Sequence, residues 1–122
     1  MLKDKNSSAI VAVSDIARAR HFYETVLGLP LLSADPMLLT FQTGTTTLVV
    51  YKSDFAGTNQ ANAVVWGVGD DVEAITADLK AKGVVFEHYP GMELQGDIHV
   101  GGDFKMVWLK DPDGNILHYN SM

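Results

Sequence analysis

The stretch Val13–Gly28 reads VSDIARARHFYETVLG, and a related stretch, VGDDVEAITADLKAKG, spans Val68–Gly83. Both begin with Val-x-Asp, both reach a glycine 15 residues after the valine, and they are offset by 55 residues. A pattern that returns at a fixed spacing indicates that one supersecondary unit occurs twice. Each stretch follows an apolar run and precedes another, which predicts a strand, a helix and a strand in each copy.

The two predicted helices carry residues that usually begin and end helices. We expect Asp15 and Asp70 to cap the N-termini, with Glu73 completing a capping box in the second copy. Gly28 and Gly83 follow the last turns, where a left-handed residue often terminates a helix. These residues predict a scaffold rather than a reactive site.

Further strands are predicted in both halves, so that each half reads β-α-β-β-β and the fold class is α+β. Residues 37–43 and 46–52 flank a short turn, as in a hairpin. Residues 103–110 and 115–120 flank DPDG, in which proline fixes φ and glycine permits a positive φ.

The two aspartates of DPDG are expected to form this turn. Asp111 and Asp113 look like paired carboxylates, but in such a turn their side chains accept hydrogen bonds from their own backbone. We therefore assign them a structural role.

The chain has 122 residues, of which 47% are hydrophobic and 20% charged, as expected of one globular domain. It has no cysteine, which excludes disulfides, zinc–thiolate sites and thiol nucleophiles. The net charge of -6 argues against a nucleic-acid partner and against docking on an anionic membrane. Neither a membrane span nor the apolar core of a signal peptide is present, so we expect a cytoplasmic protein.

Two segments interrupt the symmetry of the halves. KSDFAGTNQAN links them, and HYPGMELQGDIHVGG is inserted in the second half. From Pro90 to Gly102 the proline and four glycines oppose regular structure. We expect this insertion to be mobile without ligand and to act as a lid.

Tandem βαβββ modules, VSDIARARHFYETVLGL after the first strand and DPDGN before the last make the chain similar to the vicinal oxygen chelate superfamily. This group contains glyoxalases, bleomycin-resistance proteins and extradiol dioxygenases. The resemblance implies a cupped, eight-stranded mixed sheet around one cavity, usually in a homodimer. It covers a single domain, residues 1–122, with modules at about 6–53 and 61–122. The family's chemistries share a divalent metal that stabilises an oxyanion, whereas some members only bind a drug.

The resemblance implies metal ligands on the first and last strand of each module, and this chain departs from that pattern. Ser8 stands where metal-binding members have His or Gln, and Ala63 stands where they have His. Val49 or Val50 occupies a position for Glu or His, and His118 a position for Glu. Because a catalytic first-row metal needs about three protein ligands, we expect no metal cofactor.

The resemblance and the alternation of side chains along strands predict a ligand pocket with mostly small, apolar walls. Trp66 is expected to point the other way, against a helix. His118 has four open roles: a hydrogen-bonded core residue, a polar ligand contact, a metal ligand or a general base. The expected pocket residues are Ser8, Ile10, Ala63, Val65, Ile116, His118, Asn120 and, from the insertion, His99.

The leading hypothesis is a homodimeric protein that binds a small organic molecule without a catalytic metal. One alternative is a metal-dependent lyase or dioxygenase of the glyoxalase type. The other is a dimeric scaffold with a filled interior. The two modules are free to pair within one chain or between two chains.

Overall fold

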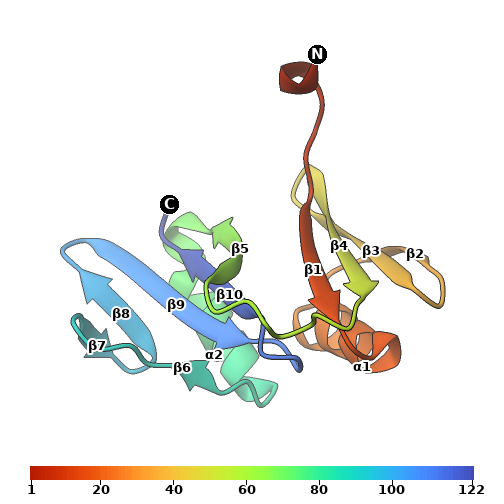
Figure 1. Cartoon of the computed structure of the whole chain (residues 1–122). Coiled ribbons are helices and arrows are strands. Elements are labelled where there is room, and N and C mark those ends of the chain that lie inside the picture. The colour runs from red at the N-terminus through yellow and green to blue at the C-terminus, as the bar shows by residue number, and fades with distance from the viewer.

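All of residues 1–122 are described by a computed structural model, in which two modules lie side by side, each a sheet with helix on one face (Figure 1). The first module comprises β1 (Ala9–Val13), α1 (Ile16–Arg20), the π-helical turn η2 (His21–Val26), β2 (Leu31–Ala34), β3 (Leu38–Thr43) and β4 (Thr46–Lys52). Its strand order is β1-β4-β3-β2, with β1 parallel to β4.

The second module repeats this plan with additions. It comprises β5 (Asn62–Gly67), η3 (Gly69–Asp71), α2 (Val72–Ala81), β6 (Phe86–Glu87), β7 (Glu93–Gln95), β8 (Ile98–Gly101), β9 (Phe104–Lys110) and β10 (Ile116–Asn120). Its strand order is β5-β10-β9-β8-β7, and β6 pairs with β9. The parallel pair β5 and β10 corresponds to β1 and β4 of the first module.

The α+β class and the tandem modules are confirmed, while the details of the sheet differ from the expectation. Ten strands form two mixed sheets, of four and six strands, that do not close into a barrel. The two strands beyond the expected eight are β7 and β8, which form a hairpin within the insertion of the second module. The expectation that the insertion lacks regular structure is therefore wrong.

The helix ends follow the sequence prediction in part. Asp15 caps α1 by accepting a hydrogen bond at 3.0 Å from the backbone N–H of Arg18. Gly28 and Gly83 both have positive φ, as predicted. The cap predicted at Asp70 is wrong, because this residue lies in the 3-10 turn η3 and α2 begins after Asp71 without a side-chain cap.

Alternation along the strands divides each sheet into two faces. The helix-facing side forms the core, where Val11, Val13, Leu117 and Tyr119 are buried. Trp66 packs against this core, as predicted. We call the opposite side of both sheets the open face. It carries Ile10, Ala12 and Val49 from the first module, and Ala63, Val65, Met106, Trp108, Ile116, His118 and Asn120 from the second.

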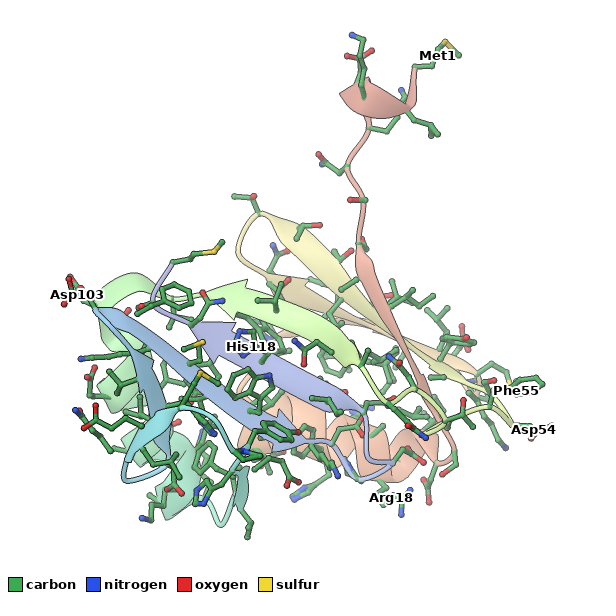
Figure 2. The ribbon with its side chains drawn as sticks, turned by 60° about the vertical axis from the view of Figure 1, so that its left-hand side comes forward. Met1, Arg18, Asp54, Phe55, Asp103 and His118 are labelled. Atoms are coloured by element: carbon green, nitrogen blue, oxygen red, sulfur yellow. The ribbon has the colours of Figure 1, made fainter.

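The N-terminal residues project away from the start of β1, with Met1 at the tip (Figures 1 and 2). The short 3-10 turn η1 (Leu2–Asp4) lies in this segment and contains no buried residue. Across the chain, no helix combines the length and the apolar character that crossing a membrane requires.

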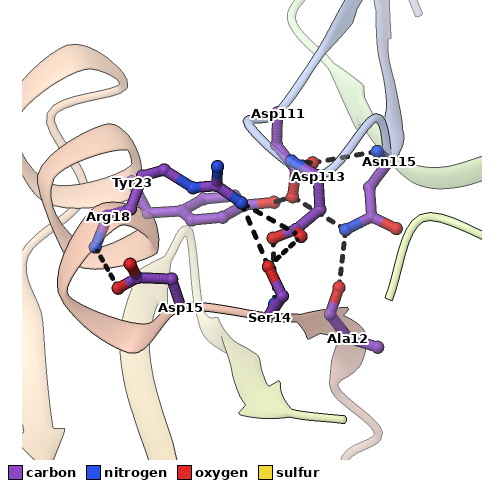
Figure 3. Close-up of polar contacts among 8 residues, drawn as sticks. All are labelled: Ala12, Ser14, Asp15, Arg18, Tyr23, Asp111, Asp113 and Asn115. Carbon is purple, nitrogen blue, oxygen red and sulfur yellow. Dashed lines mark hydrogen bonds and ion pairs between the residues drawn. The ribbon is translucent and has the colours of Figure 1, made fainter. Parts of the chain in front are cut away.

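The last turn of the second module is bound to the start of the first module's helix (Figure 3). Asp113 accepts hydrogen bonds from the Ser14 backbone N–H at 3.1 Å and the Ser14 hydroxyl at 2.6 Å. It also forms an ion pair with Arg18 at 3.2 Å. Asn115 donates from Nδ2 to the carbonyl of Ala12 at 2.8 Å. Polar contacts thus hold the two modules together within one chain.

Asp111 lies beneath this turn and is only 5% exposed. Its carboxylate accepts hydrogen bonds from the backbone N–H groups of Asp113 at 3.0 Å and Asn115 at 2.9 Å. It also accepts the hydroxyl of Tyr23, from α1's continuation, at 2.7 Å. Burial and the Asp111 charge raise the pKa of Tyr23 far above its ordinary value, so the hydroxyl stays a donor. The predicted turn role is correct for Asp111, whereas Asp113 binds the other module instead of its own backbone.

Candidate functional site

A cavity of about 260 Å³ lies where the two modules meet, and we call it the central cavity. It combines residues from β1, the end of β4, the linker between the modules, β5 and the turn before β10. Its walls are Ile10, Val11, Ala12, Tyr51, Phe55, Thr58, Asn59, Ala63 and Asn115. The cavity therefore exists only in the assembled two-module chain.

The linker that covers this cavity is held in place at Gly57. Its φ is +75°, and a Cβ at this position would lie 2.2 Å from the carbonyl oxygen of Asp113. Such a contact is impossible without movement of the backbone, so glycine lets the linker reach the last turn. Phe55, Thr58 and Asn59 are thereby brought to the cavity wall.

The walls of the central cavity combine apolar side chains with polar groups, which form about half of its surface. Asn59, Asn115 and Thr58 supply these polar groups, and the Tyr51 hydroxyl is the only ionisable one. A charged ligand would find no opposite charge on these walls, and an unpaired charge is costly to desolvate. This composition suits a small, neutral organic molecule with one or two hydrogen-bonding groups.

A cluster of four rings lies beside the central cavity on the open face of β8–β10; we call it the aromatic cluster. Trp108 stacks on His118 with ring centres 4.6 Å apart and 19° between the planes. His99 and Tyr89 meet Trp108 edge-on, at 4.9 Å and 5.3 Å. The Trp108 indole N–H donates to Asn62 Oδ1 at 3.1 Å.

That hydrogen bond shows how Trp108 is placed. β10 lies between β9, which carries Trp108, and β5, which carries Asn62. The indole must therefore reach across β10, and it covers the imidazole of His118 beneath it. His118 is only 7% exposed as a result. Figure 2 shows this part of the open face, with His118 labelled.

Both ring nitrogens of His118 are already hydrogen-bonded. Nδ1 lies 3.0 Å from the carbonyl oxygen of Val107, which can only accept, so Nδ1 carries the proton. Nε2 is then an acceptor, and the Asn120 side-chain amide donates to it at 3.1 Å. The other end of that amide, Oδ1, accepts the backbone N–H of Met122 at 3.1 Å. Burial lowers the pKa of His118, against the opposing effect of the Val107 hydrogen bond. This arrangement describes a neutral, positioned imidazole.

His99 is fully buried and has one nitrogen without a partner. Its Nε2 accepts the backbone N–H of Tyr89 at 2.8 Å, which places the ring proton on Nδ1. Nδ1 has no hydrogen-bond acceptor in the chain. The turn between β7 and β8, just before His99, contains Asp97, whose carboxylate is hydrogen-bonded to His88 at 2.8 Å. This hydrogen bond lowers the pKa of the Asp97 carboxyl.

The residues at the family's ligand positions do not fit a metal ion. The hydroxyl of Ser8 is hydrogen-bonded to that of Thr47, and Ala63 has no ligand atom. Val50 is buried in the core, and Val49 lies on the open face with an apolar side chain. His118 offers its free nitrogen lone pair to Asn120 rather than to the cavity. No group of three His, Cys, Asp or Glu side chains in the chain is arranged to hold a metal ion.

The expected pocket residues fall into separate places. Ile10 and Ala63 line the central cavity, and Val65 lies on the open face, where its side chain is exposed. His118 belongs to the aromatic cluster, with Asn120 beside it and His99 on the neighbouring strand. Ser8 is exposed before β1, and Ile116 is half-buried at the start of β10.

Several site residues were not found from the sequence. Trp108 pairs directly with His118 across β9 and β10, so alternation along 103–110 would have placed it on the open face. Phe55, Thr58 and Asn59 lie in the linker, where no periodic pattern signals orientation. Only the close contact of Gly57 with the last turn brings them to the cavity.

The fold and site define a small protein of two βαβββ modules with a cavity between them. A family model described as the glyoxalase/bleomycin resistance protein/dioxygenase superfamily matches residues 7–119. The chain therefore belongs to this superfamily, in agreement with the resemblance noted in its sequence. No curated protein matches the chain.

Solved structures share the fold at low sequence identity. The lactoylglutathione lyase from Agrobacterium tumefaciens is 18% identical with a TM-score of 0.73, over 95% of this chain and 92% of that one. A glyoxalase family protein from Enterococcus faecalis is 19% identical with a TM-score of 0.75, over 98% and 99%. A glyoxalase/bleomycin resistance protein/dioxygenase from Alicyclobacillus acidocaldarius is 20% identical with a TM-score of 0.74, over 96% and 90%. At these identities the likeness establishes the fold.

Proposed function

We propose that this chain binds a small, neutral organic molecule in the central cavity, without a catalytic metal and as a homodimer. The observation that carries the proposal is the wall of that cavity, which combines apolar side chains with three uncharged polar residues. Its volume of about 260 Å³ lies just under the range of about 300–1,000 Å³ that is usual for ligand pockets. A molecule of one or two rings matches this size.

The metal-free part of the proposal is supported by the side chains at the family's ligand positions. Metal sites need preformed ligands with available lone pairs. Here Ser8 is paired with Thr47, Ala63 is inert, and His118 lies under Trp108 with both nitrogens bonded. These contacts support a structural role for His118 within the aromatic cluster rather than a role in coordination.

The homodimer is supported by apolar side chains that the chain leaves exposed on its open face. Ile10 and Val65 are each 59% exposed, and they belong to β1 and β5, the edge strands at which the two sheets meet. Contiguous apolar surface of this kind usually marks an interface. A second copy covering the open face would also close the central cavity from solvent.

The binding proposal can be tested by nuclear magnetic resonance with a set of neutral aromatic carbonyl compounds and phenols as probes. We expect saturable shifts of the amides of Ile10, Ala63 and Asn115. Ala63→Leu, which fills the cavity, should abolish these shifts, whereas Ala17→Leu on the exposed side of α1 should keep them. Folded protein that shows no saturable shift at these amides with any probe would contradict the proposal.

A further inference from the structure

A second cavity lies on the opposite side of the molecule from the open face, and we call it the helix-side cavity. Its volume is about 230 Å³. Its walls come from α2, from the helix-facing side of β5, β9 and β10, and from the segment that follows the first module's helix. The lining residues are Leu27, Leu29, Trp66, Val68, Ile75, Asp78, Leu79, Leu109, Leu117 and Tyr119.

This cavity offers almost no hydrogen-bonding group to a ligand. The hydroxyl of Thr76 donates to the carbonyl of Val72 at 2.7 Å, so the Tyr119 hydroxyl donates to Thr76, also at 2.7 Å. Asp78, the one charged residue in the wall, is exposed and pairs with Lys82 at 3.2 Å. The remaining walls are aliphatic or aromatic.

A ligand in the helix-side cavity would therefore gain mainly from apolar contact, because the Trp66 indole N–H is the only side-chain donor left in its walls. This space of about 230 Å³ is half open to solvent, and its almost wholly apolar walls distinguish it from the other hollows of the chain. Apolar cavities of about 150 Å³ stay dry and bind benzene. The larger volume here matches a molecule of two fused rings. A polar ligand would lose its hydrogen bonds to water without replacement.

We propose that the helix-side cavity is a second binding site, for a neutral one- or two-ring aromatic or aliphatic molecule without hydrogen-bonding groups. This inference does not rest on the function proposed for the central cavity, because the two cavities share no residue and lie on opposite faces. Leu27 and Leu29 come from the first module and the other walls from the second, so ligand binding here would also stabilise the pairing of the modules.

The two tryptophans allow the two sites to be measured separately, with naphthalene as the probe. Trp66 lines the helix-side cavity, and Trp108 lies on the open face. In Trp108→Phe protein, naphthalene should change the Trp66 fluorescence in a saturable way. In Trp66→Phe protein, the Trp108 fluorescence reports binding at the open face instead. A change seen only for Trp108 would place the probe on the open face and would overturn the inference.

Cavity-filling variants complete the test in the Trp108→Phe background. Ile75→Phe and Leu27→Phe fill the space from opposite walls, and either should weaken naphthalene binding by about tenfold or more. Ala77→Phe, on the exposed side of α2, should leave it unchanged. Wild-type affinity in whichever filled variant keeps native circular dichroism would overturn the proposal. So would Trp66 fluorescence that depends on protein concentration but not on naphthalene, because a second copy would then occupy the cavity.

Discussion

At the residue scale, the position of His118 under Trp108 decides which chemistry is available to this chain. The ring donates to Val107 and accepts from Asn120, and its contacts are uncharged. Protonation would place a second proton on Nε2, facing an amide that also donates. Turning that amide would break its bond to the Met122 backbone. The neutral form is therefore favoured by hydrogen bonding as well as by burial.

This arrangement predicts a pH dependence of stability. Burial lowers the pKa of His118 in the folded chain below its ordinary value of 6.5. As pH falls through 6.5, His118 is protonated in the unfolded chain but stays neutral in the folded chain. The free energy of unfolding therefore decreases. His118→Gln removes this contribution to the pH dependence of stability. From about pH 7 to about pH 5, the melting temperature of the wild type should fall more steeply than that of the variant. Parallel curves in scanning calorimetry would contradict the assignment.

The buried carboxylate of Asp111 should matter more for stability than any exposed carboxylate. Asp111→Ala would leave the Tyr23 hydroxyl and two backbone N–H groups without acceptors. Leaving buried donors unsatisfied costs about 1–3 kcal/mol, and we expect a loss of about 3 kcal/mol in urea unfolding. Asp103→Ala, at an exposed turn (Figure 2), should change stability by less than about 0.5 kcal/mol. Equal effects of the two changes would refute the role given to Asp111.

At the element scale, repeated local patterns were predictable and tertiary pairings were not. The apolar runs and helix signals of the two copies correctly indicated β1, α1, β5 and α2. The start of α2 was misplaced because a local 3-10 turn precedes it, and Glu73 is drawn into an ion pair with Lys105 of β9. That pairing depends on a residue 32 positions away and has no local signal.

The β7–β8 hairpin was missed although its turn carries a signal. Gly96 and Asp97 separate two short apolar-polar runs, and Gly96 has φ of +63°. A Gly-Asp pair between such runs is typical of a two-residue hairpin turn. The four glycines of the insertion argue against regular structure, whereas one of them, Gly96, forms the hairpin turn.

Amide hydrogen exchange can test whether this hairpin persists in solution. β8 pairs with β7 on one side and β9 on the other, so its amides should exchange slowly without any ligand. Residues 6–8, which are exposed and precede β1, should exchange quickly and provide the internal reference. Exchange of β8 as rapid as that of residues 6–8 would restore the mobile lid expected from the sequence.

At the scale of the whole molecule, the sequence predicted two modules but not how they meet. Their junction depends on Asp113 with Ser14 and Asn115 with Ala12, pairs that are separated by about a hundred positions. The central cavity also depends on a contact between residues far apart in the chain, because the linker reaches it only where Gly57 packs against the last turn. Periodicity within one element carries no information on such contacts.

The proposed dimer predicts a particular response to charge on the open face. Sedimentation at micromolar concentrations should give twice the 13.3 kDa mass of the chain. Val65→Lys should shift the protein towards the monomer, since it places a charge among the apolar side chains of the interface. Val85→Lys, at a position away from the open face and 84% exposed, should leave the dimer intact. A wild-type monomer at high micromolar concentration would contradict the dimer.

Metal addition to chelator-treated protein tests the central claim most directly, because it measures whether a divalent metal binds to the folded chain. Nickel, zinc, manganese and iron would each be added at about a hundred micromolar while the melting temperature is followed. A site with Kd near one micromolar would contribute about 2.7 kcal/mol at that excess. On a domain of this size that is a shift of several degrees. We predict no such shift with any of the four metals; a shift of several degrees that is lost in His118→Ala would contradict the account.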